Sequence, residues 1–106
     1  MKIYIPEKVK VCGKVYDITY PYNFVDDSVY YGMCRHATLR ILLGNKSESG
    51  ETLPKDIIDE TFIHELTHTI NHIYLDNKLD ENEVGRLSEG LYQVIVDNDF
   101  IKGKDK

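Results

Sequence analysis

The alternation of polar and apolar residues predicts strands in the first half of the chain. In four segments the side chain changes between polar and apolar at nearly every position, which is typical of strands with one buried face. These segments are residues 2–5, 8–12, 14–20 and 37–43. Gly13 and Lys14 lie at the junction of two of them and predict a tight hairpin turn. We therefore expect a small antiparallel β-sheet in the N-terminal half.

The second half of the chain changes to a helical period. Pro54 suits the first turn of a helix, and the acidic residues that follow it complement the helix dipole. Apolar residues then recur at spacings of three and four as far as Tyr74. The expected core face of this helix comprises Phe62, Ile63, Leu66, Ile70 and Ile73.

A second helix is predicted from Asp80 to about Asp97. Asp80 and Glu83 have the spacing of a capping box, in which each side chain accepts a hydrogen bond from the backbone of the other residue. The residues that this helix is expected to bury are Val84, Leu87, Leu91, Val94 and Ile95. We expect residues 1–106 to form one α+β domain, a small antiparallel sheet followed by two helices.

Composition and charge narrow the classes of function. The chain carries 13 Lys and Arg against 18 Asp and Glu, so its net charge of −5 argues against a nucleic-acid partner. No apolar run approaches the ~20 residues of a membrane span, and the N-terminus lacks the features of a signal peptide. We therefore expect a cytoplasmic protein without membrane contact, in which Cys12 and Cys34 are reduced, buried thiols.

Residues 60–74, ETFIHELTHTINHIY, concentrate the titratable side chains of the first predicted helix. They include the pattern H-E-x-x-H, formed by His64, Glu65 and His68. At about 100° per residue, the histidines and Glu65 lie on one face, opposite the expected core face. Two histidines one turn apart can both bind Zn²⁺, with the glutamate beside them as a base. A solvated His/Glu face is the alternative, and the spacing favours zinc.

The motif and its surroundings resemble a known family. TFIHELTH at residues 61–68 and LSEGLYQVI at residues 87–95 look like the small phage- and prophage-borne zinc metallopeptidase-like proteins of the gluzincin type. Residues 30–43 resemble the strand that those proteins place before the active-site helix. The resemblance covers residues 30–97. It implies a minimal zincin-like fold in which a glutamate of the next helix completes the zinc site.

The third zinc ligand is expected on the second helix. His72 lies about 12 Å from His64 along a straight helix, too far for both to bind one ion. The candidates are Glu81, Glu83 and Glu89. The first two already have a role in the first helical turn, whereas Glu89 lies on a helix that is apolar on both sides, where a carboxylate needs a partner. The resemblance also favours Glu89, and Glu83 or a water remains as an alternative.

These residues predict a zinc metallopeptidase that acts on a peptide or protein substrate. Glu65 would be the general base for water activated by Zn²⁺, and the strand at residues 37–43 could pair with an extended substrate. A peptidase also needs a hydrogen-bond donor for the oxyanion. The candidates are Arg35, His36, His72, Tyr74 and Tyr92. The alternative is a zinc-containing regulatory or protein-binding module with little or no turnover. A metal-free interaction protein is the third and weakest hypothesis.

Overall fold

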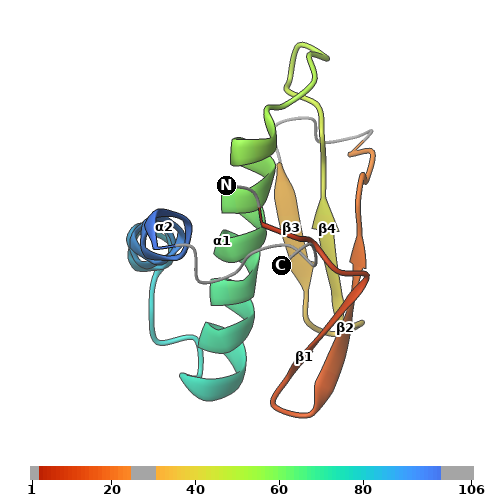
Figure 1. The fold of residues 1–106 in the computed structure, drawn as a ribbon. Helices are drawn as coiled ribbons and strands as arrows, with labels where there is room; N and C mark the ends of the chain where they lie inside the picture. The colour runs from red at the N-terminus through yellow and green to blue at the C-terminus, as the bar shows by residue number, and fades with distance from the viewer. Residues whose placement is uncertain (1–2, 25–30, 99–106) are drawn as a thin grey trace.

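The computed structural model describes residues 3–24 and 31–98, which form an α+β fold of four strands followed by two helices. One face of the sheet is covered by α1, and α2 packs on the side of α1 that faces away from the sheet (Figure 1). The elements are β1 (Lys8–Val11), β2 (Lys14–Thr19), β3 (Gly32–Arg35), β4 (Arg40–Leu43), α1 (Lys55–Tyr74) and α2 (Glu81–Asp97). The order of strands before helices is confirmed, but the strand expected at residues 2–5 is wrong, because residues 3–5 belong to no strand, and β3 is not one of the four segments that alternation predicted.

The sheet is mixed, which corrects the expectation of an antiparallel sheet. Its strand order is β1-β2-β4-β3, with antiparallel pairs at both ends and a parallel pair of β2 with β4 in the middle. Polar and apolar alternation reports that a strand has one buried face, but it carries no information on the direction of the neighbouring strand. β4 is consequently an interior strand, and Ile41, Leu42 and Leu43 are completely buried.

The hairpin between β1 and β2 turns one residue earlier than expected. Its two turn residues are Cys12 and Gly13, with φ of 52° and 79°. Tight two-residue hairpins often need this left-handed backbone at both positions, and glycine adopts it without steric cost. Lys14 is the first residue of β2. Cys12 is therefore exposed at a turn, contrary to the expectation of a buried thiol.

Cys34 partly matches the expected buried thiol. It is half-buried on β3, and its Sγ lies 3.2 Å from Oγ1 of Thr69 on α1. Burial raises the pKa of this thiol to about 11, and the nearby Glu65 carboxylate acts in the same direction. The Cys34 side chain thus remains a protonated thiol at neutral pH and helps to pack β3 against α1.

α1 is covered on two sides because it lies between the sheet and α2. Phe62 and Ile63 join the central core as predicted, and Leu66 and Ile73 pack against its edge. Ile70 is 43% exposed and does not belong to this core. Since α2 covers the side of the helix that was expected to face solvent, His64 and His68 are only partly exposed.

α2 buries only part of the face that its apolar residues predicted, since Val84 and Ile95 are buried as expected and the other three expected residues are not. The capping box is confirmed, with Glu83 N 2.8 Å from Asp80 Oδ1 and Asp80 N 2.9 Å from Glu83 Oε1. The buried residues are Val84, Ser88, Tyr92 and Ile95. The expected core residues Leu87, Leu91 and Val94 are instead 54%, 42% and 48% exposed. Of the described helices, neither is long and apolar enough to cross a membrane.

Candidate metal centre

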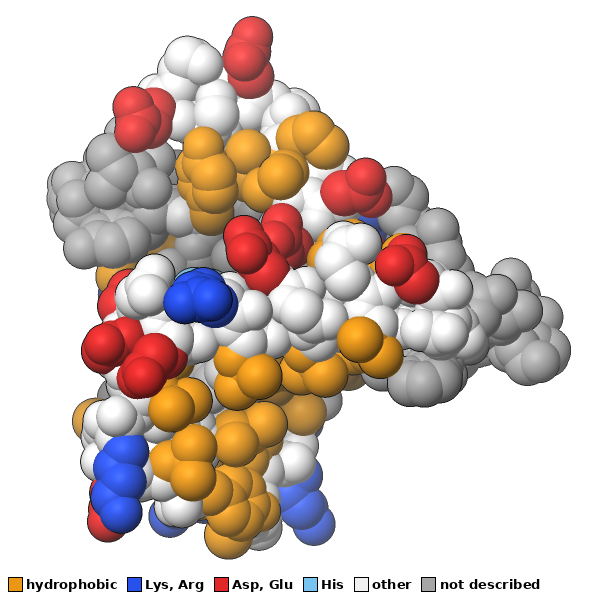
Figure 2. All heavy atoms as spheres, turned by 90° about the vertical axis from the view of Figure 1, so that its left-hand side faces the viewer, with side chains coloured by type: hydrophobic (Ala, Val, Ile, Leu, Met, Phe, Trp, Pro, Cys, Tyr) orange, Lys and Arg blue, Asp and Glu red, His pale blue; other side chains and the backbone are white. Residues whose placement is uncertain are grey.

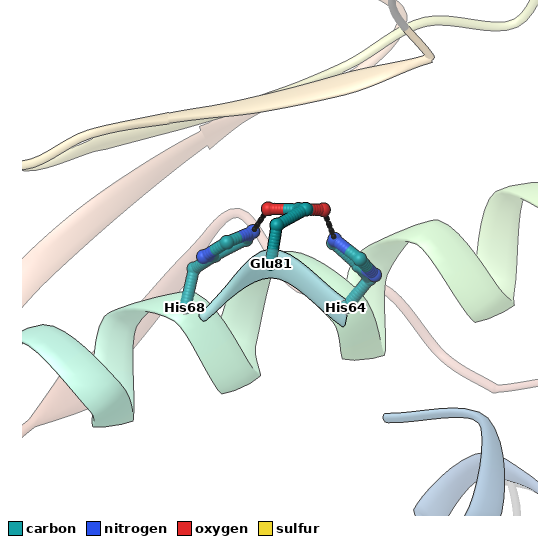
Figure 3. A group of neighbouring side chains, drawn as sticks. All are labelled: His64, His68 and Glu81. Carbon is teal, nitrogen blue, oxygen red and sulfur yellow. Dashed lines mark hydrogen bonds and ion pairs between the residues drawn. The ribbon is translucent and has the colours of Figure 1, made fainter. Parts of the chain in front are cut away.

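His64 and His68 of α1 converge with Glu81, the first residue of α2 (Figure 3). His64 Nε2 lies 3.1 Å from one carboxylate oxygen of Glu81, and His68 Nε2 lies 3.0 Å from the other. One possible ligand atom from each of the three residues lies within 4.8 Å of the other two. Two imidazole nitrogens and one carboxylate oxygen form the donor set of several catalytic zinc sites. The three residues could therefore hold one metal ion.

The link between the two helices places Glu81 above the histidines. The side chain of Asn71, near the end of α1, donates to the Leu79 carbonyl at 3.0 Å and accepts from the Leu79 backbone N–H at 3.1 Å. The capping box of Asp80 then starts α2 at the next residue. These local contacts fix where the second helix begins, and so fix the position of the Glu81 carboxylate.

Hydrogen bonding around His64 directs its Nε2 towards Glu81. The Ser88 hydroxyl donates its hydrogen to the Gly85 carbonyl at 3.0 Å. In its 3.3 Å contact with His64 Nδ1 the hydroxyl oxygen is therefore the acceptor, and Nδ1–H is the donor. In the neutral ring Nε2 then carries a lone pair, the state in which it binds a metal. An ionised carboxylate has no proton to donate, so a short contact between Glu81 and that lone pair requires a proton or a cation between them.

His68 has the electrostatics of a neutral ligand. Burial lowers the pKa of its imidazole below the usual value, while the Glu81 carboxylate opposes this and His64 adds to it. The lowered pKa favours the unprotonated ring at neutral pH, and only an unprotonated nitrogen can bind a metal. The environment of His68 therefore suits metal binding.

Glu65 lies beside these residues but is not one of the three. Its side chain is buried, with 6% exposure, and it lines the same groove as His64 and His68. No hydrogen bond among the described residues reaches its carboxylate, which therefore faces the groove. Burial raises the pKa of Glu65 to about 7, and the negative charge of Glu81 adds to this effect. A carboxyl group that titrates near neutrality is suited to general base and acid catalysis.

The groove that holds these side chains has a volume of about 980 Å³ and opens to solvent. Its walls come from β3, α1 and α2. The site is therefore assembled from three elements that are separated in the sequence, and it leaves room for a ligand next to the His64–His68–Glu81 trio.

Gly32 allows β3 to approach α1 at the level of Glu65. A Cβ atom at this position would lie 2.5 Å from Thr61 Cγ2 and 3.2 Å from both Cγ and Oε2 of Glu65. We therefore expect Gly32→Ala to displace β3 or the Glu65 side chain, and to lower the free energy of unfolding by about 1–3 kcal/mol. Urea denaturation measures this change.

Gly90→Ala is the matched control for Gly32→Ala. Gly90 lies within α2, and a Cβ atom there would meet nothing within 4 Å. Because alanine favours helix over glycine, this control should raise the free energy of unfolding by roughly 0.5–1 kcal/mol. If Gly32→Ala is as stable as the unmodified protein, the close approach of β3 to α1 is not as described.

The carboxylate that the structure places beside the two histidines is Glu81, and the expected ligand Glu89 lies outside this group. Glu89 is exposed because the face of α2 next to it is not buried, so the argument that it must have a partner does not apply. It lines the groove but does not join the trio. Glu83 holds the capping box with its side chain. One feature of the sequence pointed to Glu81. The link between the two helices has six residues, enough to run back along the ~9 Å of helix between Tyr74 and His68 and so to bring the start of the second helix to the histidines.

None of the expected oxyanion donors lines the groove in the described part of the chain. Tyr92 is in the core, and Tyr74 is 58% exposed. His72 stacks on His36 with ring centroids 3.9 Å apart, and the Arg35 guanidinium lies over the ring of Tyr22. The donors that line the groove are instead Tyr31, Asn82 and Arg86. Tyr31 directly precedes β3, a position to which sequence pattern alone assigns no role.

Comparisons with known proteins add no relative to this description. No protein-family model matches the chain. Neither the curated proteins nor the solved structures contain a match. The resemblance to gluzincin-type proteins therefore rests on the residues quoted above, and the function is inferred from the geometry of the site.

Proposed function

We propose that the chain is a zinc-dependent peptidase in which His64, His68 and Glu81 hold the metal and Glu65 is the general base. The observation that carries this proposal is the convergence of two imidazoles and one carboxylate from two helices, next to a buried carboxylate that faces an open groove. Harder cations such as Mg²⁺ and Ca²⁺ prefer oxygen ligands only, so two nitrogens among three donors favour zinc or a similar transition metal.

The residues around the metal divide the chemistry between them. When bound, zinc supplies a Lewis acid that polarises the substrate carbonyl and lowers the pKa of water. Glu65 accepts the proton of the attacking water and passes it to the leaving amine, a pair of transfers that a carboxyl group with a pKa of about 7 can perform at neutral pH. Ser88 holds the His64 ring through Nδ1 and so orients Nε2.

An extended substrate would pair with β3. The expectation that residues 37–43 offer a free edge is wrong, because β4 is hydrogen-bonded to β2 on one side and to β3 on the other. β3 pairs with β4 along one edge, and no described strand pairs with its other edge. Gly32, Met33 and Cys34 of β3 line the groove. A peptide added to this edge by main-chain hydrogen bonds would pass the trio.

A zinc-containing binding or regulatory module is the second candidate function. The placement of the expected oxyanion donors favours it, since all five lie outside the groove. Without a donor aimed at the oxyanion, an acyl-transfer site loses a factor of about 10²–10³ in kcat. Tyr31, Asn82 or Arg86 would have to supply that donor in the peptidase.

Metal analysis combined with a cleavage screen tests both functions. The protein is purified without added zinc, its metal content is measured, and it is incubated with a peptide library with and without a chelator. A peptidase should contain about one zinc ion per chain, and chelation should abolish cleavage that added zinc restores. Zinc without cleavage supports the binding module. Failure to bind zinc, even when zinc is added, rejects both functions.

A further inference from the structure

The groove extends beyond the trio to a second pair of carboxylates, Glu60 and Glu89. Glu60 lies one turn before His64 on α1, and Glu89 follows Ser88, whose hydroxyl contacts His64. Both line the same groove, Glu60 from α1 and Glu89 from α2. Acidic side chains gather along the upper edge of α2 in the view of that helix (Figure 2).

Neither carboxylate of this pair is neutralised within the described residues. The ion pairs there join Lys8 with Asp17, Lys55 with Asp59, and the two histidines with Glu81. Arg86 is the single Lys or Arg among the described residues that line the groove, and no described ion pair joins it to Glu60 or Glu89. Both carboxylates are consequently free to accept a cation from a ligand.

The charges of the metal site would not cancel the negative charges of Glu60 and Glu89. A bound Zn²⁺ would be balanced by the carboxylates of Glu81 and Glu65. Glu65 is more than nine-tenths buried, faces the groove and has no hydrogen-bond partner among the described residues. Glu60 and Glu89 then contribute two further negative charges against the one positive charge of Arg86. In a groove with low-dielectric walls, such an imbalance attracts groups of the opposite sign.

We propose that Glu60 and Glu89 select a Lys or Arg side chain in the peptide, one or two residues from the bond that is cleaved. This inference rests on the proposed peptidase function, because it names the substrate class of that site. The distance between Glu60 and His64 along α1 gives the position of this Lys or Arg in the peptide. One turn of α1 separates Glu60 from His64 by about 6 Å along the helix axis. An extended peptide advances about 3.3 Å per residue, so this distance corresponds to one or two residues.

Peptide binding tests the inference without relying on turnover. The unmodified protein is used with a chelator that removes zinc, so that it binds peptides without cleaving them and keeps the Glu65 carboxylate. Three fluorescent peptides that differ only in a central Lys, norleucine or Glu are titrated, and binding is followed by anisotropy. The Lys peptide should bind most tightly and the Glu peptide least tightly. Exposed ion pairs of this kind change affinity by about 2–5-fold per carboxylate, and the preference should weaken in high salt.

Two double variants decide whether the preference belongs to this pair of carboxylates. Under the same conditions, Glu60→Gln with Glu89→Gln should abolish the difference between the Lys and norleucine peptides. Glu48→Gln with Glu51→Gln makes the same change in net charge in the exposed loop before α1, and it should leave the difference intact. An equal loss in both double variants would show an effect of net charge alone and would overturn the inference. Thermal unfolding confirms that all variants are folded.

The substrate preference and the peptidase function can fail separately. If the unmodified protein binds no zinc and cleaves nothing, but the Lys preference is present and depends on Glu60 and Glu89, the peptidase function is rejected and the cationic site stands. If the unmodified protein cleaves peptides in a zinc-dependent reaction without preference for Lys or Arg, the peptidase stands and this inference is rejected.

Discussion

Replacing Glu65 with glutamine is expected to abolish peptide cleavage while the protein retains about one zinc ion per chain. Glutamine has nearly the same shape as glutamate, but it cannot accept the proton of the attacking water. Loss of a general base typically lowers kcat by about 10²–10⁴-fold. Zinc remains bound because the trio consists of His64, His68 and Glu81. Peptide cleavage assays and metal analysis on the same sample measure both quantities.

Glu51→Gln is the matched control for this experiment, because Glu51 lies in the exposed loop before α1. It should change neither cleavage nor zinc content. Loss of zinc from Glu65→Gln would show that Glu65 is a ligand or that it supports the ligands. Undiminished cleavage would exclude Glu65 as the base.

The same substitution has a pH-dependent effect on the metal-free protein. The pKa of Glu65 is raised from 4.5 to about 7, mainly by burial. Between these two values the unfolded chain releases a proton that the folded protein retains, so the folded state loses stability as the pH rises. Glu65→Gln removes this loss. With chelator present, the variant should therefore be more stable than the unmodified protein above pH 7, and the difference should shrink as the pH falls towards 4.5.

Replacing Glu81 with glutamine is expected to weaken zinc binding strongly, whereas Glu89→Gln should leave it unchanged. Loss of a residue that only supports a ligand typically weakens metal affinity by 10–100-fold, so loss of the ligand itself should cost at least ~100-fold. Glu81 contacts both histidines, and Glu89 does not belong to the trio. Competition for zinc with a chromophoric chelator gives the affinities of both variants.

The histidines supply the matched pair for this second experiment. His68→Ala should reduce zinc affinity as Glu81→Gln does. His72→Ala should not, because its ring stacks on His36 and does not belong to the trio. If Glu89→Gln loses zinc and Glu81→Gln keeps it, the ligand assignment is reversed and α2 must be placed differently over the histidines.

Local sequence signals specified most of the secondary structure. The helical spacing after Pro54, the Asp80–Glu83 capping box and the alternation in the strands each depend on residues a few positions apart. The structure confirms both helices and three of the four strands that these signals predicted, the exception being residues 2–5. The H-E-x-x-H motif belongs to the same class, because its spacing alone places His64 and His68 on neighbouring turns of one helix. Signals over such short distances can be recognised without knowledge of the rest of the fold.

Only the tertiary structure decided which surfaces meet. The apolar residues of α2 allowed two buried faces, and its packing on α1 buried Ser88 and Tyr92 and left Leu91 exposed. Because α2 packs with this face on α1, Glu89 lies outside the trio. The contacts of Asn71 with the link between the helices place Glu81 in it. The parallel pairing of β2 with β4 likewise left β3 as the edge strand beside the groove. Each outcome depends on contacts between residues far apart in the chain, whose energies no short segment of sequence contains.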